Sequence, residues 1–345
     1  MKVLKFGGSS LANPECIRQV ATIILQAAQK EQVIVVVSAF HGVTNQLLES
    51  ATLAAAGDKR YEKMAKAIAA RHLIALDELH HKHNAQQARS NVQPILNELH
   101  ELLQGIYLLR DCSPRASDAI ASFGERLSAF VMASYVNQKV RSKSVDARQL
   151  IVTDAAFTNA NVLFDKTNAT IRHFFNQFFK QHKKVIAVIT GFIAANEEGI
   201  TTTIGRNGSD YSAAIIGAAL NAKLIEIWTD VDGVYSADPR SVKKSFVLPR
   251  LSYEEAMELS YFGAKVLHTS TIAPAITKHI PVLIKNTFKP NLRTFIEIHP
   301  QLLVRRDSPA GQFHLFFFES FLLRVEYKPL RPRILYHKAM LEYRG

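Results

Sequence analysis

Apolar and polar positions in the first fifty residues follow two alternating periods. Lys2–Phe6 and Val33–Val37 are short apolar runs, and the continuous β-branched second run is typical of a strand buried on both faces. Between them, apolar residues recur at helical spacing from Ile17 to Leu25, after Asn13 as a helix cap and Pro14 as the first helical residue. A strand, a helix and a second strand at this spacing predict a βαβ unit in a parallel sheet.

A segment of different character interrupts this alternation. Residues 50–110 are rich in Ala, Leu, Glu, Lys, Gln and His, which predicts a helical insertion between core strands. The threonine run within Gly199–Ile204 is suited to an edge hairpin. Further helices are expected at 114–136, 210–220, 253–262 and 264–278, the last two broken near Gly263, and further strands at 185–189, 224–228 and 282–284. The pattern predicts an α/β fold with a mainly parallel sheet.

From about residue 291 the pattern loses any clean helical or strand period. We therefore expect one domain over residues 1–290 and an atypical C-terminal tail over residues 291–345, to which the sequence gives no role.

Composition narrows the class of protein. The chain has 345 residues, of which 48% are hydrophobic and 21% charged, a globular profile without an apolar run long enough to span a membrane. Two cysteines and the lack of a signal-peptide pattern favour a cytoplasmic protein. The formal charge of +12 comes from scattered bases, so we expect a solvated surface and no nucleic-acid or membrane partner. His80, His81 and His83 lack a ligand set, and no protein metal site is expected.

The first chemical motif is the glycine pair that follows the first strand. Gly7 and Gly8 would let backbone amides approach a phosphate, with Ser9 and Ser10 beside them, and Lys5 could reach a transferring phosphoryl oxygen. An ordinary strand-to-helix turn with a surface lysine would have the same sequence. The spacing matches neither a Walker A loop nor a dinucleotide fingerprint.

The second motif is the segment 205–210, which precedes an Ala-rich helix. Arg206 can grip a carboxylate with its planar fork, and Ser209 with the helix amides can hold an anion. Asp210 could take an ammonium group or position a lysine. A polar loop with a capping residue is the structural alternative, and the density of anion-binding groups favours function.

The third motif, residues 229–240, follows a strand, where an open α/β sheet presents groups to ligands. Asp230 and Asp232 suggest a metal site, or simple turn chemistry. Weaker candidates lie elsewhere in the chain: Glu125 could bind an amino group or pair with Arg126, and Lys265 lies near a helix start. Ser38 and Thr44 lie at and just beyond the end of the second strand.

Taken together, these segments resemble the aspartate kinases of the amino-acid kinase superfamily. The segment Ser252–His268 is most similar to the kinase half of bifunctional aspartokinase–homoserine dehydrogenases. The resemblance runs from Met1 to about residue 290 and rests on Lys5–Ser10, Val35–Gln46, Gly124–Ser128, Gly191–Ser212, Trp228–Arg240 and Ser252–His268.

The resemblance implies a three-layer αβα sandwich, a homodimer, and Mg²⁺ with ATP as cosubstrate. It also implies phosphorylation of the L-aspartate side chain to 4-phospho-L-aspartate, the first step of lysine, threonine and methionine biosynthesis. Lys5, Asp210 and Lys265 would be catalytic. The expected aspartate-binding residues are Ser38, Thr44, Glu125, Arg206 and Ser209. The expected nucleotide-binding residues are Lys5, Gly7, Gly8, Ser9, Thr229, Asp230, Tyr235, Arg240 and Lys265.

This chemistry suits the residues. An aspartate side chain has a reference pKa of about 3.9, so it is ionised near neutral pH and needs no general base. The enzyme's task is to bring two anions together, which lysines, backbone amides and Mg²⁺ can do.

The sequence departs from the family in two places. Thr269 and Ser270 replace the usual proline-containing pair after His268, and nothing after residue 291 resembles the family's regulatory ACT domains or a dehydrogenase. Three alternatives stay open: a catalytically impaired protein that binds ATP or an amino acid, a kinase of the same fold with another acceptor (glutamate, N-acetylglutamate, carbamate or UMP), and a basic nucleic-acid-binding module.

Overall fold

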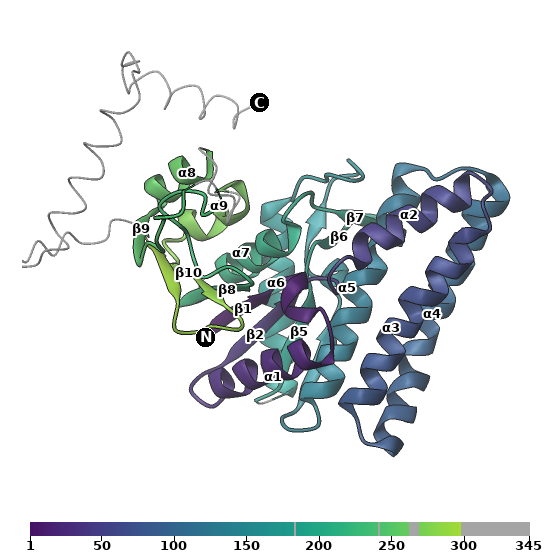
Figure 1. The fold of residues 1–345 in the computed structure, drawn as a ribbon, viewed down its shortest axis with the longest axis horizontal. Coiled ribbons are helices and arrows are strands. Elements are labelled where there is room, and N and C mark those ends of the chain that lie inside the picture. The colour runs from purple at the N-terminus through teal and green to yellow at the C-terminus, as the bar shows by residue number, and fades with distance from the viewer. Residues whose placement is uncertain (183, 241, 262–268, 298–345) are drawn as a thin grey trace, which may run out of the picture. The chain divides into compact units, whose positions relative to one another are not determined.

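The computed structural model describes residues 1–182, 184–240, 242–261 and 269–297. Among these residues, eight strands form the central sheet (Figure 1). In spatial order they are β3 (Ser142–Val145), β5 (Ile186–Thr190), β2 (Val33–Val37), β1 (Lys2–Phe6), β8 (Leu224–Thr229), β10 (Val282–Asn286), β11 (Arg293–Glu297) and β9 (Arg250–Ser252). The first six run parallel, whereas β11 is antiparallel to β10 and β9 is parallel to β11. The expected mainly parallel sheet is confirmed.

A small second sheet has the strand order β4 (Val152–Thr153), β6 (Ile193–Asn196) and β7 (Thr201–Thr203). Strands β6 and β7 pair antiparallel and form the hairpin expected from the threonine run. The second sheet leads directly into the segment 205–210, because β7 ends two residues before Gly205.

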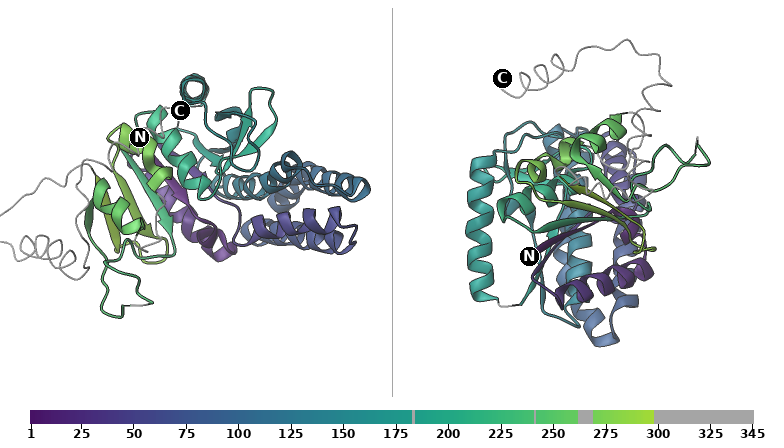
Figure 2. Two further views of the ribbon diagram at one scale, coloured as in Figure 1. Left: turned by 90° about the horizontal axis from the view of Figure 1, so that it is seen from above. Right: turned by 90° about the vertical axis from the view of Figure 1, so that its left-hand side faces the viewer.

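Helices cover both faces of the central sheet (Figures 1 and 2), which confirms the three-layer sandwich. Alternate residues of each buried strand serve the two cores: Leu4 and Phe6 face one, and Val3 faces the other. The first core contains α1 (Pro14–Ala28), α2 (Val43–Ala55), α3 (Arg60–Leu79), α4 (Lys82–Leu109) and α5 (Pro114–Val136). The second contains α6 (Phe164–Gln181), α7 (Gly208–Ala219), α8 (Tyr253–Tyr261) and α9 (Thr269–Thr277).

The helical insertion is also confirmed. Helices α3 and α4 lie side by side in Figure 1 and pack against α2 and α5. The short 3₁₀ helices η1 (Gly8–Leu11) and η2 (Ala147–Gln149) follow β1 and β3. At the start of α1, the Asn13 side chain accepts from the Cys16 amide, as the capping pattern predicts.

One expectation about the strands is wrong. The segment 282–284 was expected to be the last strand, but β11 follows it and lies beyond residue 290. Its sequence gives a weak strand signal because charged residues, Arg293 and Glu297, occupy both ends. The break near Gly263 and most of the expected tail, residues 298–345, fall outside the described residues.

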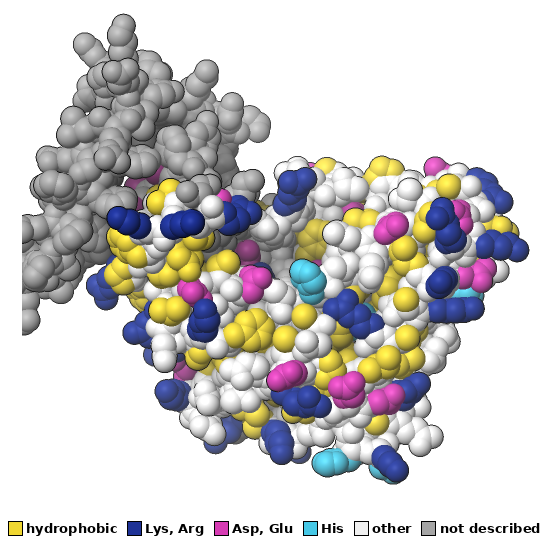
Figure 3. Space-filling view, in the orientation of Figure 1, with side chains coloured by type: hydrophobic (Ala, Val, Ile, Leu, Met, Phe, Trp, Pro, Cys, Tyr) yellow, Lys and Arg dark blue, Asp and Glu magenta, His cyan; other side chains and the backbone are white. Residues whose placement is uncertain are grey.

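Two surface properties bear on the partners of the protein. In the part of the chain that the structure describes, no helix is both long enough and apolar enough to cross a bilayer. Figure 3 shows Lys and Arg side chains spread over the visible face and mixed with Asp and Glu, without one large basic patch.

Candidate active site

The candidate site forms where three neighbouring strands end at the same level. In the register of the sheet, Phe6 of β1 lies between Val37 of β2 and Trp228 of β8. The loops that follow are fixed by backbone hydrogen bonds: the Gly7 amide donates to the Trp228 carbonyl (3.0 Å), and the Ser38 amide donates to the Phe6 carbonyl (3.1 Å). These carboxyl ends are where a parallel α/β sheet presents groups to a ligand.

Lys5 and Asp210 meet at this edge and form an ion pair. The Lys5 Nζ lies 2.5 Å from the Asp210 Oδ1, and each side chain is about 10% exposed. Asp210 stands in the first turn of α7, so its carboxylate also benefits from the positive end of the helix dipole. Of the two roles considered from the sequence, this ion pair favours the second, in which Asp210 positions a lysine.

Glu125 is buried beside the loop that follows β2. Its Oε1 accepts from the Ala39 amide (3.2 Å), and its Oε2 has no hydrogen-bond partner among the described residues. Burial raises the pKa of Glu125 to about 8, although the Ala39 amide and the charge of Lys5 act in the opposite direction. Arg126 pairs with Glu98 and not with Glu125. The carboxyl group is thus free to receive a ligand's ammonium group.

A glycine brings the β2 loop close to α5. A methyl group at Gly124 would lie 2.7 Å from the Ala39 Cβ and 3.7 Å from the Thr44 Oγ1. The Ser38 carbonyl accepts from the Ser128 hydroxyl (2.6 Å), which ties the loop to the same helix. Ser38 and Thr44 therefore lie on a loop and helix start that approach α5 beside Glu125.

The segment before α7 approaches from the other side. Gly191, just after β5, packs so tightly on Ser209 that a methyl group there would lie 2.6 Å from the Ser209 Cβ. Ser209 is buried in the first turn of α7. Arg206 is exposed in the preceding loop, and its guanidinium forms no hydrogen bond or ion pair with the residues that the structure describes. It is available for a ligand.

The first of the two glycines after β1 differs from the expectation. Both were expected to offer their amides to a phosphate, but the Gly7 amide already donates to Trp228. Gly8 allows the loop after β1 to lie close to the loop after β2, because a methyl group at Gly8 would lie 3.0 Å from the Ala39 carbonyl oxygen. Ser9 is half-buried in η1. The loop after β1 is thus locked to the loop after β2.

The third motif is held both by its own residues and by β10 and β11, since the Asn286 side chain donates to the Asp230 carbonyl (3.1 Å) and the Val234 amide donates to the Thr294 hydroxyl (2.9 Å). The Thr229 hydroxyl donates to Asp230 (3.1 Å), and Arg240 pairs with Asp238 in an exposed loop. The Tyr235 hydroxyl donates to the Asp232 Oδ2 (3.2 Å), and the Asp232 Oδ1 accepts from the side-chain Nδ2 of Asn286 (2.6 Å). Asp232 is therefore a structural acceptor.

Among the described residues, no hydrogen bond or ion pair links Tyr235 or Arg240 to the Lys5–Asp210 pair. Lys265, expected both in catalysis and at the nucleotide, lies outside the described residues. Within the described ranges, no group of three or more His, Cys, Asp or Glu side chains could hold a metal ion.

Several supporting residues had no signal in the sequence. Ser128 fastens the β2 loop, the Thr287 hydroxyl bonds to Ser10 (2.7 Å), and Asp118 accepts from the hairpin that leads to Arg206. Each bond links residues far apart in the chain, and an isolated Ser, Thr or Asp carries no pattern.

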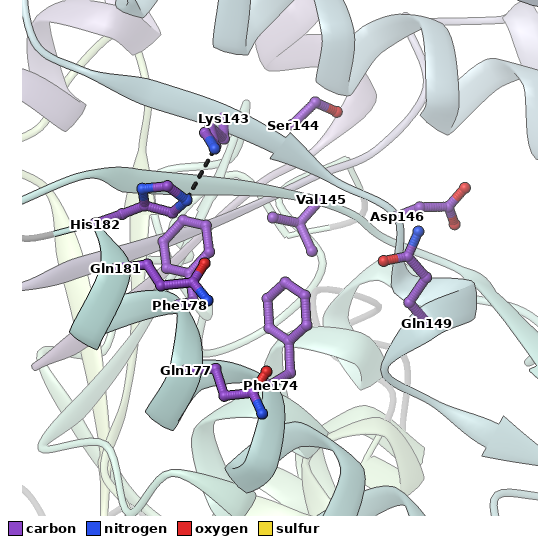
Figure 4. Close-up of a pocket in the computed structure, with 10 residues that line it drawn as sticks. All are labelled: Lys143, Ser144, Val145, Asp146, Gln149, Phe174, Gln177, Phe178, Gln181 and His182. Carbon is purple, nitrogen blue, oxygen red and sulfur yellow. Dashed lines mark hydrogen bonds between the residues drawn. The ribbon is translucent and has the colours of Figure 1, made fainter.

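A separate cavity of about 390 Å³ lies between β3 and α6 (Figure 4). Phe174 and Phe178 line it, and the Lys143 Nζ lies 2.9 Å from the His182 Nε2 at its rim. None of the residues expected at the active site lines this cavity.

Known proteins support a family assignment. The profile of the "Amino acid kinase family" matches residues 1–286, which covers most of the chain, so this chain belongs to the amino acid kinase family. Among curated relatives, the bifunctional aspartokinase/homoserine dehydrogenase 2 of Arabidopsis thaliana is 38% identical over 288 residues, covering 83% of this chain and 31% of the relative. Aspartokinase 1 of the same plant is 36% identical, covering 84% of this chain and 50% of the relative.

Solved structures show the same likeness. The E. coli aspartokinase III bound to aspartate and ADP superposes with a TM-score of 0.79 at 29% identity, covering 88% of this chain and 65% of that one. This chain thus spans between about a third and a half of the two curated relatives that it matches.

Proposed function

We propose that the chain catalyses ATP-dependent phosphorylation of the side-chain carboxylate of L-aspartate. The observation that carries the proposal is the buried Lys5–Asp210 pair beside Glu125, whose second carboxyl oxygen has no partner among the described residues. A cation for a phosphoryl group and an acid for an ammonium group lie at one sheet edge. The similarity to aspartokinases, one of them solved with aspartate and ADP, supports the same substrates.

The binding step uses complementary charges. Glu125 would accept the substrate ammonium group, and Arg206 would bind its α-carboxylate in a bidentate contact. The hydroxyl groups of Ser38, Thr44 and Ser209 would hold the remaining oxygens. A free amino acid therefore fits the site better than carbamate or UMP, which lack this pair of charged groups.

The transfer step needs positioning and charge neutralisation. A side-chain oxygen of aspartate attacks the γ-phosphorus, the bond from that phosphorus to the β–γ bridging oxygen breaks, and 4-phospho-aspartate and ADP result. Lys5 would neutralise charge on the transferring group, and Asp210 would hold the Lys5 ammonium group in place. Because the acceptor is already ionised, no proton has to be removed.

The residues also fit Mg²⁺ as a partner of the nucleotide. Mg²⁺ commonly binds substrate phosphates with few protein ligands. When bound, Mg²⁺ supplies charge neutralisation between the phosphates. We keep Gly8, Ser9, Thr229, Asp230, Tyr235, Arg240 and Lys265 as proposed nucleotide contacts, with a homodimer as a further proposal. The catalytic domain, expected to end at about residue 290, is proposed to extend through β11 to Glu297.

Trapping the acyl phosphate with hydroxylamine tests the function. Aspartate with ATP should give aspartyl hydroxamate, whereas glutamate, N-acetylglutamate, carbamate and UMP should give no product in matched phosphoryl-transfer assays. Nucleotide binding without product from any acceptor would favour a non-catalytic protein. Salt-dependent binding to generic DNA would favour a nucleic-acid-binding module.

The first prediction concerns Lys5. Lys5→Ala removes the cation from the transferring group, and we expect turnover to fall by about 10²–10³-fold. Lys2→Ala is the matched control, because Lys2 lies in the same strand and pairs with Glu31 and Glu226 away from the site. A folded Lys5→Ala protein with the turnover of Lys2→Ala would contradict the role of Lys5.

A further inference from the structure

Arg71 of α3 joins the two loops that carry the candidate site. Its Nη1 donates to the His41 carbonyl and its Nη2 to the Ala12 carbonyl, each at 2.7 Å. Ala12 ends the segment that begins at Gly7, after β1, and His41 belongs to the loop after β2. One guanidinium thus holds the ends of two different loops.

The same helix supports the β2 loop through an aromatic stack. The His72 ring lies on the Phe40 ring, with 4.5 Å between ring centroids and an angle of 17°. The Arg71 guanidinium lies 5.8 Å from the centroid of the same Phe40 ring. Phe40 and His72 are both buried, and the His72 Nδ1 bonds to the Ile68 carbonyl (2.8 Å). The loop is therefore fixed at two consecutive residues, Phe40 and His41.

The two loops depend on a close mutual fit. Gly8 of the first approaches the Ala39 carbonyl of the second, and the Ala39 amide donates to Glu125. A small displacement between the loops would separate Gly8 from Ser38 and Ala39, and would shift both loops relative to Lys5 and Glu125. A displacement of about 1 Å in reacting groups can cost about 100-fold in rate.

We propose that Arg71 is a positioning residue that holds the nucleotide loop (residues 7–12) and the aspartate loop (residues 38–42) in register. The inference rests on the proposed function for the identity of the two ligands. It gives the helical insertion a part in the site, although no insertion residue is expected to touch a substrate. The planar fork of arginine suits two separate carbonyl oxygens, which a single ammonium group would satisfy less well.

The kinetic test compares Arg71→Met and Arg71→Lys with the wild type. Arg71→Met keeps the length of the side chain but removes both donors, so kcat/KM for aspartate should fall about 100-fold and the KM values for aspartate and ATP should both rise. Arg71→Lys should recover part of this loss. Arg18→Met is the matched control, because Arg18 also donates from a helix to a backbone carbonyl, that of Glu78 (2.8 Å).

A second measurement does not depend on activity. Hydrogen–deuterium exchange of the backbone amides should quicken in both loops, residues 7–12 and 38–42, in Arg71→Met and in neither loop in Arg18→Met. If the wild type transfers no phosphate, the proposed function fails, and the exchange data still test whether Arg71 holds the two loops together. If Arg71→Met keeps wild-type KM values, or exchange quickens in one loop only, Arg71 does not hold the two loops together.

Discussion

At the scale of single residues, burial decides which groups are ready for a ligand. Glu125 and Asp210 are both buried carboxyl groups near Lys5, yet they differ in partners. Asp210 is paired with Lys5, whereas among the described residues Glu125 has one amide donor and no partner for its second oxygen. Desolvation outweighs the opposing charge of Lys5 and leaves Glu125 mostly protonated near neutral pH, so an incoming ammonium group would favour its ionised form.

This difference predicts how aspartate binding depends on pH. The pKa of Glu125, raised to about 8, means that the anion that binds the ammonium group forms only as the pH rises. We expect the KM for aspartate to fall by about tenfold per pH unit between pH 6.5 and 7.5 and to level off above pH 8. Glu125→Gln cannot ionise, so its KM should be high and independent of pH. A flat profile in the wild type would show that Glu125 does not bind the ammonium group.

At the scale of elements, helices and strands with a local sequence pattern could be predicted, whereas contacts between residues far apart in the chain could not. Asn13 and Pro14 mark the start of α1 because a cap acts within one turn, and the β-branched run of β2 reflects its burial on both faces. Strand β11 was missed because it has only five residues and charged ones, Arg293 and Glu297, occupy both ends. The pairing of Arg71 with two loops leaves no local pattern at all.

The buried His72 of α3, which stacks on Phe40 of the aspartate loop, predicts that acid lowers the stability of the fold. Burial lowers the pKa of His72 to about 4, with Arg71 acting in the same direction and the Ile68 carbonyl against it. Because the unfolded chain then binds the extra proton between about pH 6.5 and pH 4, the free energy of unfolding falls as the pH is lowered through this range. The loss attributable to His72 should reach about 3 kcal/mol.

Urea unfolding of the wild type and of His72→Phe at pH 7 and pH 4.5 measures this effect. Phenylalanine keeps a ring against Phe40 and cannot be protonated, so the variant should lose less stability on acidification. Equal losses in the two proteins would mean that His72 takes up a proton as readily in the folded state as in the unfolded state.

At the scale of the whole molecule, the site exists because distant segments end at one sheet edge. The sequence motifs pointed to the main groups of the site, Lys5, Glu125 and Asp210, because each lies near a glycine or a helix start that is visible in the sequence. The parallel order of β1, β2 and β8 predicts only that these groups lie at the same edge of the sheet, and it does not predict which side chains meet there. The actual partners, such as Lys5 with Asp210, depend on side-chain packing that periodicity does not describe.

Asp118 of α5 connects the central layers to the second sheet, and its removal should affect both stability and aspartate binding. Its Oδ2 accepts from the Thr158 amide (2.8 Å) and the Thr203 amide (3.1 Å), and its Oδ1 accepts from the Thr203 hydroxyl (2.7 Å). Asp118→Ala leaves buried amides without acceptors, so the free energy of unfolding should fall by about 2–4 kcal/mol. Because Thr203 precedes the Arg206 loop, the KM for aspartate should also rise.

Asp118→Asn separates the hydrogen bonds from the charge. Its carboxamide oxygen can accept from both amides while its NH₂ group donates to the Thr203 hydroxyl, so the loss should be about 1 kcal/mol or less. Asp77→Ala is the surface control, since Asp77 is 44% exposed and pairs with Arg89, and it should change stability by no more than about 0.5 kcal/mol. Thermal unfolding and aspartate titration of the three variants test this order. An Asp118→Ala protein as stable as Asp77→Ala would show that the second sheet is held by other contacts, and that Arg206 is placed without Asp118.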